Sequence, residues 1–209
     1  MRNAYIILGV AWLIVIAIGV YAFNHRFMSK GDTGTEISHA TSTSMMSSTL
    51  SLTSTAFSEG ASIPSKYTCD GEQVHPADGG VNPPLSISGV PAEAKSLALI
   101  MDDLDVPKQL RPDGVFNHWT LFNIPPQTTE IATGVTIGVP GANGAGKNTY
   151  AGPCPPPQYQ PNEHRYTLTL YALDQELPLK AGASKADVLQ AMQGHILAQA
   201  QLIGKYKRQ

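Results

Sequence analysis

The sequence predicts a mainly β fold, an antiparallel β-sandwich with one helix near the C-terminus. Its apolar segments are short and typical of strands, and turn residues separate them. Glycine and proline are frequent, with 19 and 16 among the 209 residues. No alternation of strands with helices occurs, which argues against a parallel sheet with crossover helices.

The composition fits one globular domain and limits its partners. Hydrophobic residues make up 42% of the chain, and the formal net charge is −2. Domains that bind nucleic acid usually carry a basic surface. We therefore expect no nucleic acid as a partner.

Residues 1–28 are expected to form an N-terminal membrane anchor or signal segment. Residues 4–23 are an uncharged run of 20 residues, which is long enough to cross a bilayer as a transmembrane helix. Because signal peptides usually have a shorter apolar core, we favour an uncleaved anchor; cleavage would give a secreted protein. The prediction is a membrane-anchored protein whose folded domain is extracytoplasmic, either periplasmic or extracellular.

A linker and a folded domain are expected to follow. Residues 29–49 are rich in Ser and Thr, and a segment so poor in apolar residues cannot fold alone. The folded domain should then cover residues 50–209. Within it, apolar patterns predict strands at residues 50–57, 85–90, 96–101, 116–124 and 165–173.

A helix is predicted near the C-terminus. Ser184 can cap it, with Asp187 three positions later as in a capping box. Apolar residues then recur near helical spacing, at Val188, Met192, Ile196 and Ile203, with Leu189 and Leu197 widening the apolar face. His195 falls within this helix and is expected to be structural.

Residues 141–148 read Gly-Ala-Asn-Gly-Ala-Gly-Lys-Asn and nearly match a phosphate-binding P-loop. That motif needs Ser or Thr where Asn148 stands, and a helix should follow it. Proline-rich sequence follows instead and cannot continue a helix. We interpret the segment as a loop.

Carboxylates cluster after the predicted 96–101 strand, at Asp102, Asp103 and Asp105. In an extended chain Asp103 and Asp105 point the same way, so they need a cation, hydrogen-bond donors or a proton between them. The spacing of a calcium-binding EF-hand is absent. A solvated turn at the strand end is the alternative, and we expect no metal.

Two histidines lie on predicted strands. Strand alternation places His118 on one face with Phe116, Thr120 and Phe122, and places His164 on one face with Tyr166. A histidine in an apolar strand is often a core residue, and this remains the alternative for His118. Imidazoles also donate hydrogen bonds to phosphate or carboxylate oxygens. Together with the aspartates, they predict a site for a small polar ligand.

A Gly- and Pro-dense loop precedes the second histidine, and Gly152, Pro153 and Cys154 lie in it. Loops held by a rigid sheet often carry binding residues. The second cysteine is Cys69, and the pair is compatible either with one disulfide or with two free thiols. A free Cys154 could serve as a nucleophile with His164 as its base, and a disulfide would exclude that role.

Several motifs occur in one order and together resemble the phosphatidylethanolamine-binding protein family, in its bacterial and archaeal Raf-kinase-inhibitor-like branch. The resemblance covers roughly residues 50–207. The motifs lie at residues 63–71, 82–85, 96–103, 117–119, 152–156, 164–166 and 191–198. Leu104 is a departure, because the family usually has proline between the two aspartates.

The resemblance implies an antiparallel β-sandwich with a C-terminal helix and a small anion pocket. It assigns to that pocket Asp103, Asp105, Phe116, His118, Gly152, Pro153, His164 and Tyr166. The expected function is a membrane-tethered binding protein for phosphate, a phospholipid head group or an acetate-like anion, with no cofactor. The alternatives are an interaction module that inhibits a protease or kinase, and a hydrolase with a histidine base.

Overall fold

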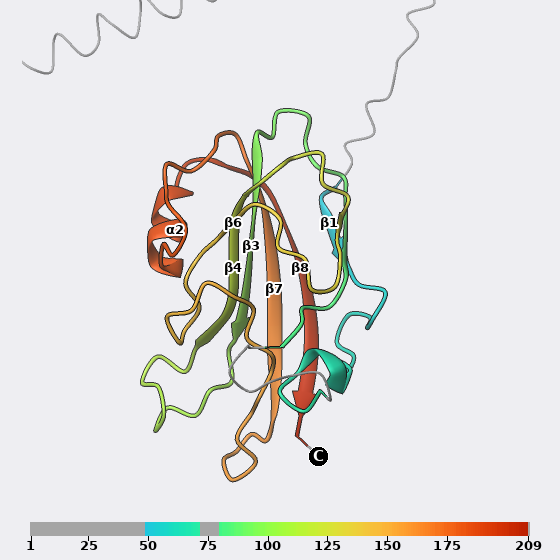
Figure 1. The fold of residues 1–209 in the computed structure, drawn as a ribbon, viewed down its shortest axis with the longest axis vertical. Helices are drawn as coiled ribbons and strands as arrows, with labels where there is room; N and C mark the ends of the chain where they lie inside the picture. Colours follow the sequence, from blue (N-terminus) through green and yellow to red (C-terminus); the bar gives the residue numbers. More distant parts are fainter. Residues whose placement is uncertain (1–48, 72–79, 209) are drawn as a thin grey trace, which may run out of the picture. The chain divides into compact units, whose positions relative to one another are not determined.

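The computed structural model describes residues 49–71 and 80–208. Within these ranges the chain forms two antiparallel sheets and one α-helix (Figure 1). The smaller sheet has the order β1-β2-β5, with β1 at Ser51–Thr53, β2 at Leu85–Ser88 and β5 at Glu130–Ile131. The larger sheet has the order β6-β4-β3-β7-β8, with β6 at Val139–Pro140, β4 at Phe116–Ile124, β3 at Ser96–Asp103, β7 at Glu163–Leu173 and β8 at Ile196–Lys207.

The main core contains apolar side chains from both sheets. Leu52 and Ile87 of the smaller sheet share one buried cluster with Leu99 and Leu168 of the larger one. Along β7, alternate residues enter this cluster, at Tyr166, Leu168 and Leu170. The mainly antiparallel β architecture is therefore as the sequence predicts.

A second, smaller core lies against the other face of the larger sheet. The helix α2 (Lys185–Ala191) contributes Val188, which packs in one cluster with Ile100, Phe122 and Leu173. Ser184 and Asp187 form the predicted capping box at its start. In Figure 1, α2 stands beside the larger sheet, near β6.

The helix is much shorter than the sequence pattern suggests. It ends at Ala191, and a turn through Gly194, whose φ is +81°, leads into β8. A positive φ suits glycine, because it lacks a Cβ. In β8 every second side chain turns inward, with Leu202 and Tyr206 buried. The prediction of a helix to residue 203 was therefore wrong beyond the first two turns.

His195 does not lie in a helix. It sits in the turn before β8, where its Nδ1 is 2.9 Å from Asp174 Oδ1. Of the predicted strand at residues 50–57, only Ser51–Thr53 pairs with a neighbour, although Phe57 is still buried in the main core. Residues 141–148 form no helix, in agreement with their interpretation as a loop.

The predicted localisation needs correction. Across residues 49–71 and 80–208, no helix is long and apolar enough to cross a membrane. The prediction of a membrane-anchored, extracytoplasmic domain is therefore withdrawn. Residues 4–23, on which the transmembrane helix rested, and residues 29–48 of the expected linker lie outside the described residues.

Candidate functional site

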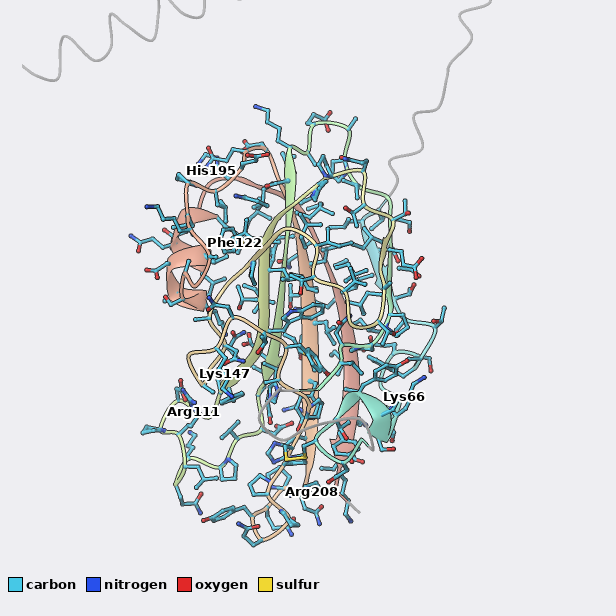
Figure 2. The ribbon with its side chains drawn as sticks, viewed as in Figure 1. Lys66, Arg111, Phe122, Lys147, His195 and Arg208 are labelled. Carbon is cyan, nitrogen blue, oxygen red and sulfur yellow. A yellow bond between two sulfur atoms is a disulfide. The ribbon has the colours of Figure 1, made fainter. Side chains whose placement is uncertain are left out.

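A cavity of about 380 Å³ opens where β3 ends and β4 and β7 begin, against three loops. Figure 2 shows the nearby disulfide as a yellow bond, at the opposite end of the folded domain from His195. The cavity is lined by Cys69, Asp103, Val106, Phe116, His118, Ala151, Gly152, Cys154, Pro155, Pro156 and His164. The walls are largely apolar, and the polar side chains are few.

The pairing of β3 with β7 brings Asp103 and His164 together. Asp103 lies opposite Tyr166, and His164 lies two residues earlier on the same face of β7. His164 Nδ1 is 2.7 Å from Asp103 Oδ2, and the two side chains are only 1% and 5% exposed. His164 Nε2 lies 3.0 Å from the carbonyl oxygen of Pro161. Both nitrogens of this ring are therefore already hydrogen-bonded.

A β-bulge places His118 in the cavity. Met101 pairs with Trp119, whereas Asp102 pairs with Asn117, so His118 is the extra residue on β4. A bulge changes which face the neighbouring side chains occupy. The prediction that Thr120 and Phe122 share a face with His118 was therefore wrong. Phe122 belongs to the smaller core, on the other side of the sheet.

His118 is held on several sides. Its Nδ1 is 2.7 Å from the carbonyl oxygen of Ala151. The rings of Phe116 and Tyr166 meet the imidazole edge to face, with centroids 4.7 and 5.2 Å away. Burial lowers the pKa of His118, and the Ala151 carbonyl and the Asp103 carboxylate only partly oppose that effect. A neutral ring is thus favoured near neutral pH.

The Asp105 carboxylate does not line the cavity and binds Arg165 instead. It binds the Arg165 guanidinium at 2.8 and 2.7 Å and accepts the Arg165 backbone N–H. These bonds from Arg165 lower the pKa of Asp105. The two aspartates therefore do not point the same way, as we expected for an extended chain. Asp103 Oδ1 instead accepts the backbone N–H of Asp105.

Tyr166 and Pro153 lie behind the cavity wall. The Tyr166 side chain is fully buried, and its hydroxyl has no hydrogen-bond partner within the described part of the chain. Burial and the nearby Asp103 carboxylate raise the pKa of Tyr166. Pro153 is also buried, and its carbonyl oxygen accepts the Cys69 N–H at 3.1 Å.

Cys69 and Cys154 form a disulfide whose Cα atoms are 5.4 Å apart. It joins the loop after the 3-10 helix η1 (Ser65–Tyr67) to the Gly- and Pro-dense loop, and both sulfur-bearing residues line the cavity. Cys154 therefore cannot be the free nucleophile considered above.

Gly152 has no room for a side chain. A Cβ built there would lie 2.9 Å from the carbonyl carbon and 3.0 Å from the Cα of Thr68. Both are backbone atoms, so the loop would have to move. We expect Gly152→Ala to lower the free energy of unfolding by about 1–3 kcal/mol, measured by urea denaturation. An unchanged transition would contradict this close packing.

Sequence reasoning missed four cavity residues, namely Val106, Ala151, Pro155 and Pro156. The two prolines follow Cys154 directly, so the composition of the loop could have indicated them. Ala151 acts on His118 through its carbonyl oxygen, and no side-chain pattern reveals a backbone contact.

Residues 53–207 match the phosphatidylethanolamine-binding protein family. The chain belongs to this family. A UPF0098 protein from Chlamydia muridarum is 47% identical over 160 residues, which cover 76% of this chain and 99% of the relative. Another, from Methanothermobacter thermautotrophicus, is 48% identical over 166 residues, with the same coverage of both chains.

Solved structures agree with this family assignment. The crystal structure of a putative phosphatidylethanolamine-binding protein homologue from Chlamydia trachomatis matches with a TM-score of 0.71 and 45% identity. The match covers 78% of this chain and 100% of the Chlamydia trachomatis protein. Escherichia coli YbcL, described as a member of the mammalian family, matches with a TM-score of 0.64 and 25% identity, covering 77% and 99% of the two chains.

The departure at Leu104 leaves Asp103 firmly placed. The Leu104 side chain is 46% exposed, and its backbone N–H lies 3.4 Å from the Arg165 carbonyl oxygen, a contact that proline could not make. Asp103 is oriented by His164 and by the Asp105 N–H. This member of the phosphatidylethanolamine-binding protein family thus aims its carboxylate without the usual proline.

Proposed function

We propose that the cavity binds a small oxyanion, either free phosphate or the phosphate of a lipid head group. The observation that carries this proposal is a set of buried polar side chains, Asp103, His118 and His164, in an otherwise apolar cavity. Pockets that bind small ligands typically combine apolar walls with a few placed polar groups.

The volume and the family both support a ligand of this size. A cavity of about 380 Å³ falls in the lower part of the range usual for small-molecule sites. The family description names phosphatidylethanolamine, whose head group contains a phosphate. A phosphate-bearing ligand therefore fits both the space and the family.

Calorimetric titration of the protein with phosphate and with phosphoethanolamine tests the proposal. We expect binding that is lost in His118→Phe, because phenylalanine keeps a ring in the cavity and removes both nitrogens. His195→Phe is the matched control, since His195 bonds Asp174 at the other end of the domain. Absence of binding to either compound by the unmodified protein would refute the proposal.

A protein-docking role is the second candidate. The loop between β3 and β4 supplies Val106 to the cavity and exposes Leu104 and Leu110, at 46% and 48%. Exposed apolar side chains at a pocket rim are common where proteins interact. A partner protein whose binding is competed by phosphate would favour this role.

A further inference from the structure

His164 has no proton left to donate to a ligand. Its Nε2 faces the Pro161 carbonyl oxygen, which can only accept, so Nε2 carries a proton. The contact of 2.7 Å between its Nδ1 and Asp103 Oδ2 requires a second proton between these atoms. Whether that proton resides on His164 or on Asp103, the two side chains together have no net charge. Both ring nitrogens of His164 are already hydrogen-bonded to protein atoms.

His118 presents an acceptor to the cavity. Its Nδ1 faces the Ala151 carbonyl oxygen at 2.7 Å and must carry the proton of the neutral ring. No hydrogen bond from the described residues reaches its Nε2, and His118 lines the cavity. Burial lowers the pKa of this histidine. Near neutral pH, its Nε2 therefore offers a lone pair.

Among the described residues, no cation compensates for these groups, because the cavity lining includes neither Lys nor Arg. The titratable groups around His118 are Asp102 and Asp103 from β3 and His164 and Tyr166 from β7. The loop residues that line the cavity add none, since both cysteines are in the disulfide. Three basic side chains have other partners, with Arg111 over the Phe116 ring, Arg165 on Asp105 and Lys185 on Asp102.

We infer that the cavity prefers an oxyanion that brings its own acidic proton, namely inorganic phosphate or the singly ionised form of a phosphate monoester. This inference rests on the proposed function. The P–OH group of such a ligand donates to His118 Nε2, which lies in the cavity lining. The apolar walls formed by Phe116, Pro155 and Pro156 accommodate the substituent of an ester.

An anion without such a proton is disfavoured. Sulfate is similar in shape but has no proton at neutral pH, and a phosphodiester, as in a phospholipid, has none either. Their oxygens would face the lone pair of His118 Nε2, and an acceptor left unpaired in a buried site is costly. Such ligands bind only if His118 takes up a proton, so their affinity falls as the pH rises.

Calorimetry on the full chain separates these cases. Phosphate, sulfate and glycerophosphoethanolamine, a diester, are titrated between about pH 6 and pH 8. Each titration is repeated in two buffers of different ionisation enthalpy, which gives the protons exchanged on binding. At the acid end, we expect phosphate to bind about tenfold or more tightly than sulfate. We also expect phosphate to bind there without proton uptake and sulfate to take up about one proton per site.

A variant tests the role assigned to His118. In His118→Gln the amide can turn either its oxygen or its NH₂ group to the ligand, so the preference for phosphate over sulfate should largely disappear. His195→Gln should keep it. Equal binding of phosphate and sulfate without proton uptake would overturn this inference and leave the proposed function intact, as would a diester that binds more tightly than phosphate. Failure of all three compounds to bind would overturn both.

Discussion

Replacing Asp103 with Asn should lower the free energy of unfolding by about 3–5 kcal/mol, the usual cost of removing one partner from a buried ion pair. The Asp103 carboxylate accepts from His164 Nδ1 and from the Asp105 backbone N–H. Asparagine has one oxygen for these two donors, and its NH₂ group would face one of them. Because His164 is only 1% exposed, water cannot replace the lost acceptor. Urea denaturation followed by circular dichroism measures the loss.

Asp105→Asn is the matched control, two residues away with the same chemical change. Asp105 also binds a basic side chain, but its partner Arg165 is 58% exposed. Solvent screens such pairs and they contribute little, so we expect a much smaller loss of stability. If both variants lost stability equally, burial would not be the reason for the effect of Asp103→Asn.

The sequence predicted the long central strands of the larger sheet, β3, β4 and β7, and misread β8 at one edge of that sheet. In β7, Tyr166, Leu168 and Leu170 enter the main core as their alternation predicts, although the threonines between them are also buried. The edge strand β8 contains alanine and glutamine at residues 198–201, which favour helices intrinsically. Pairing with β7 along its whole length overrides that preference. Helix propensity is a weak guide where a neighbouring strand offers a complete hydrogen-bonding edge.

The candidate site was predictable in its residue types and less so in its geometry. Motif positions placed Asp103, His118 and His164 in one site, and the structure brings all three to one cavity. The bulge at His118 was not predictable, because alternation assumes an unbroken register. The sequence also did not predict that both ring nitrogens of His164 are hydrogen-bonded. One of them contacts the Pro161 carbonyl oxygen, a backbone atom that no side-chain pattern indicates.

Removing the disulfide should have an effect as large as that of removing Asp103. The bond between Cys69 and Cys154 spans a sequence separation of 85 residues. In the chain-entropy account, closing a loop of this length stabilises the fold by about 4.5 kcal/mol, because it restricts the unfolded chain. We expect the double variant Cys69→Ala/Cys154→Ala to lose about that much, measured by urea denaturation under non-reducing conditions.

The same variant should still bind phosphate with an affinity close to that of the unmodified protein. Two contacts between the joined loops do not depend on sulfur, namely the Cys69 N–H bond to the Pro153 carbonyl and the close packing of Gly152 on Thr68. The Ala151 carbonyl, which orients His118, lies outside the bridge. Reduction of the unmodified protein should reproduce the loss of stability and leave the double variant unchanged. A variant that kept its stability but lost phosphate binding would show instead that the disulfide shapes the folded cavity rather than restricting the unfolded chain.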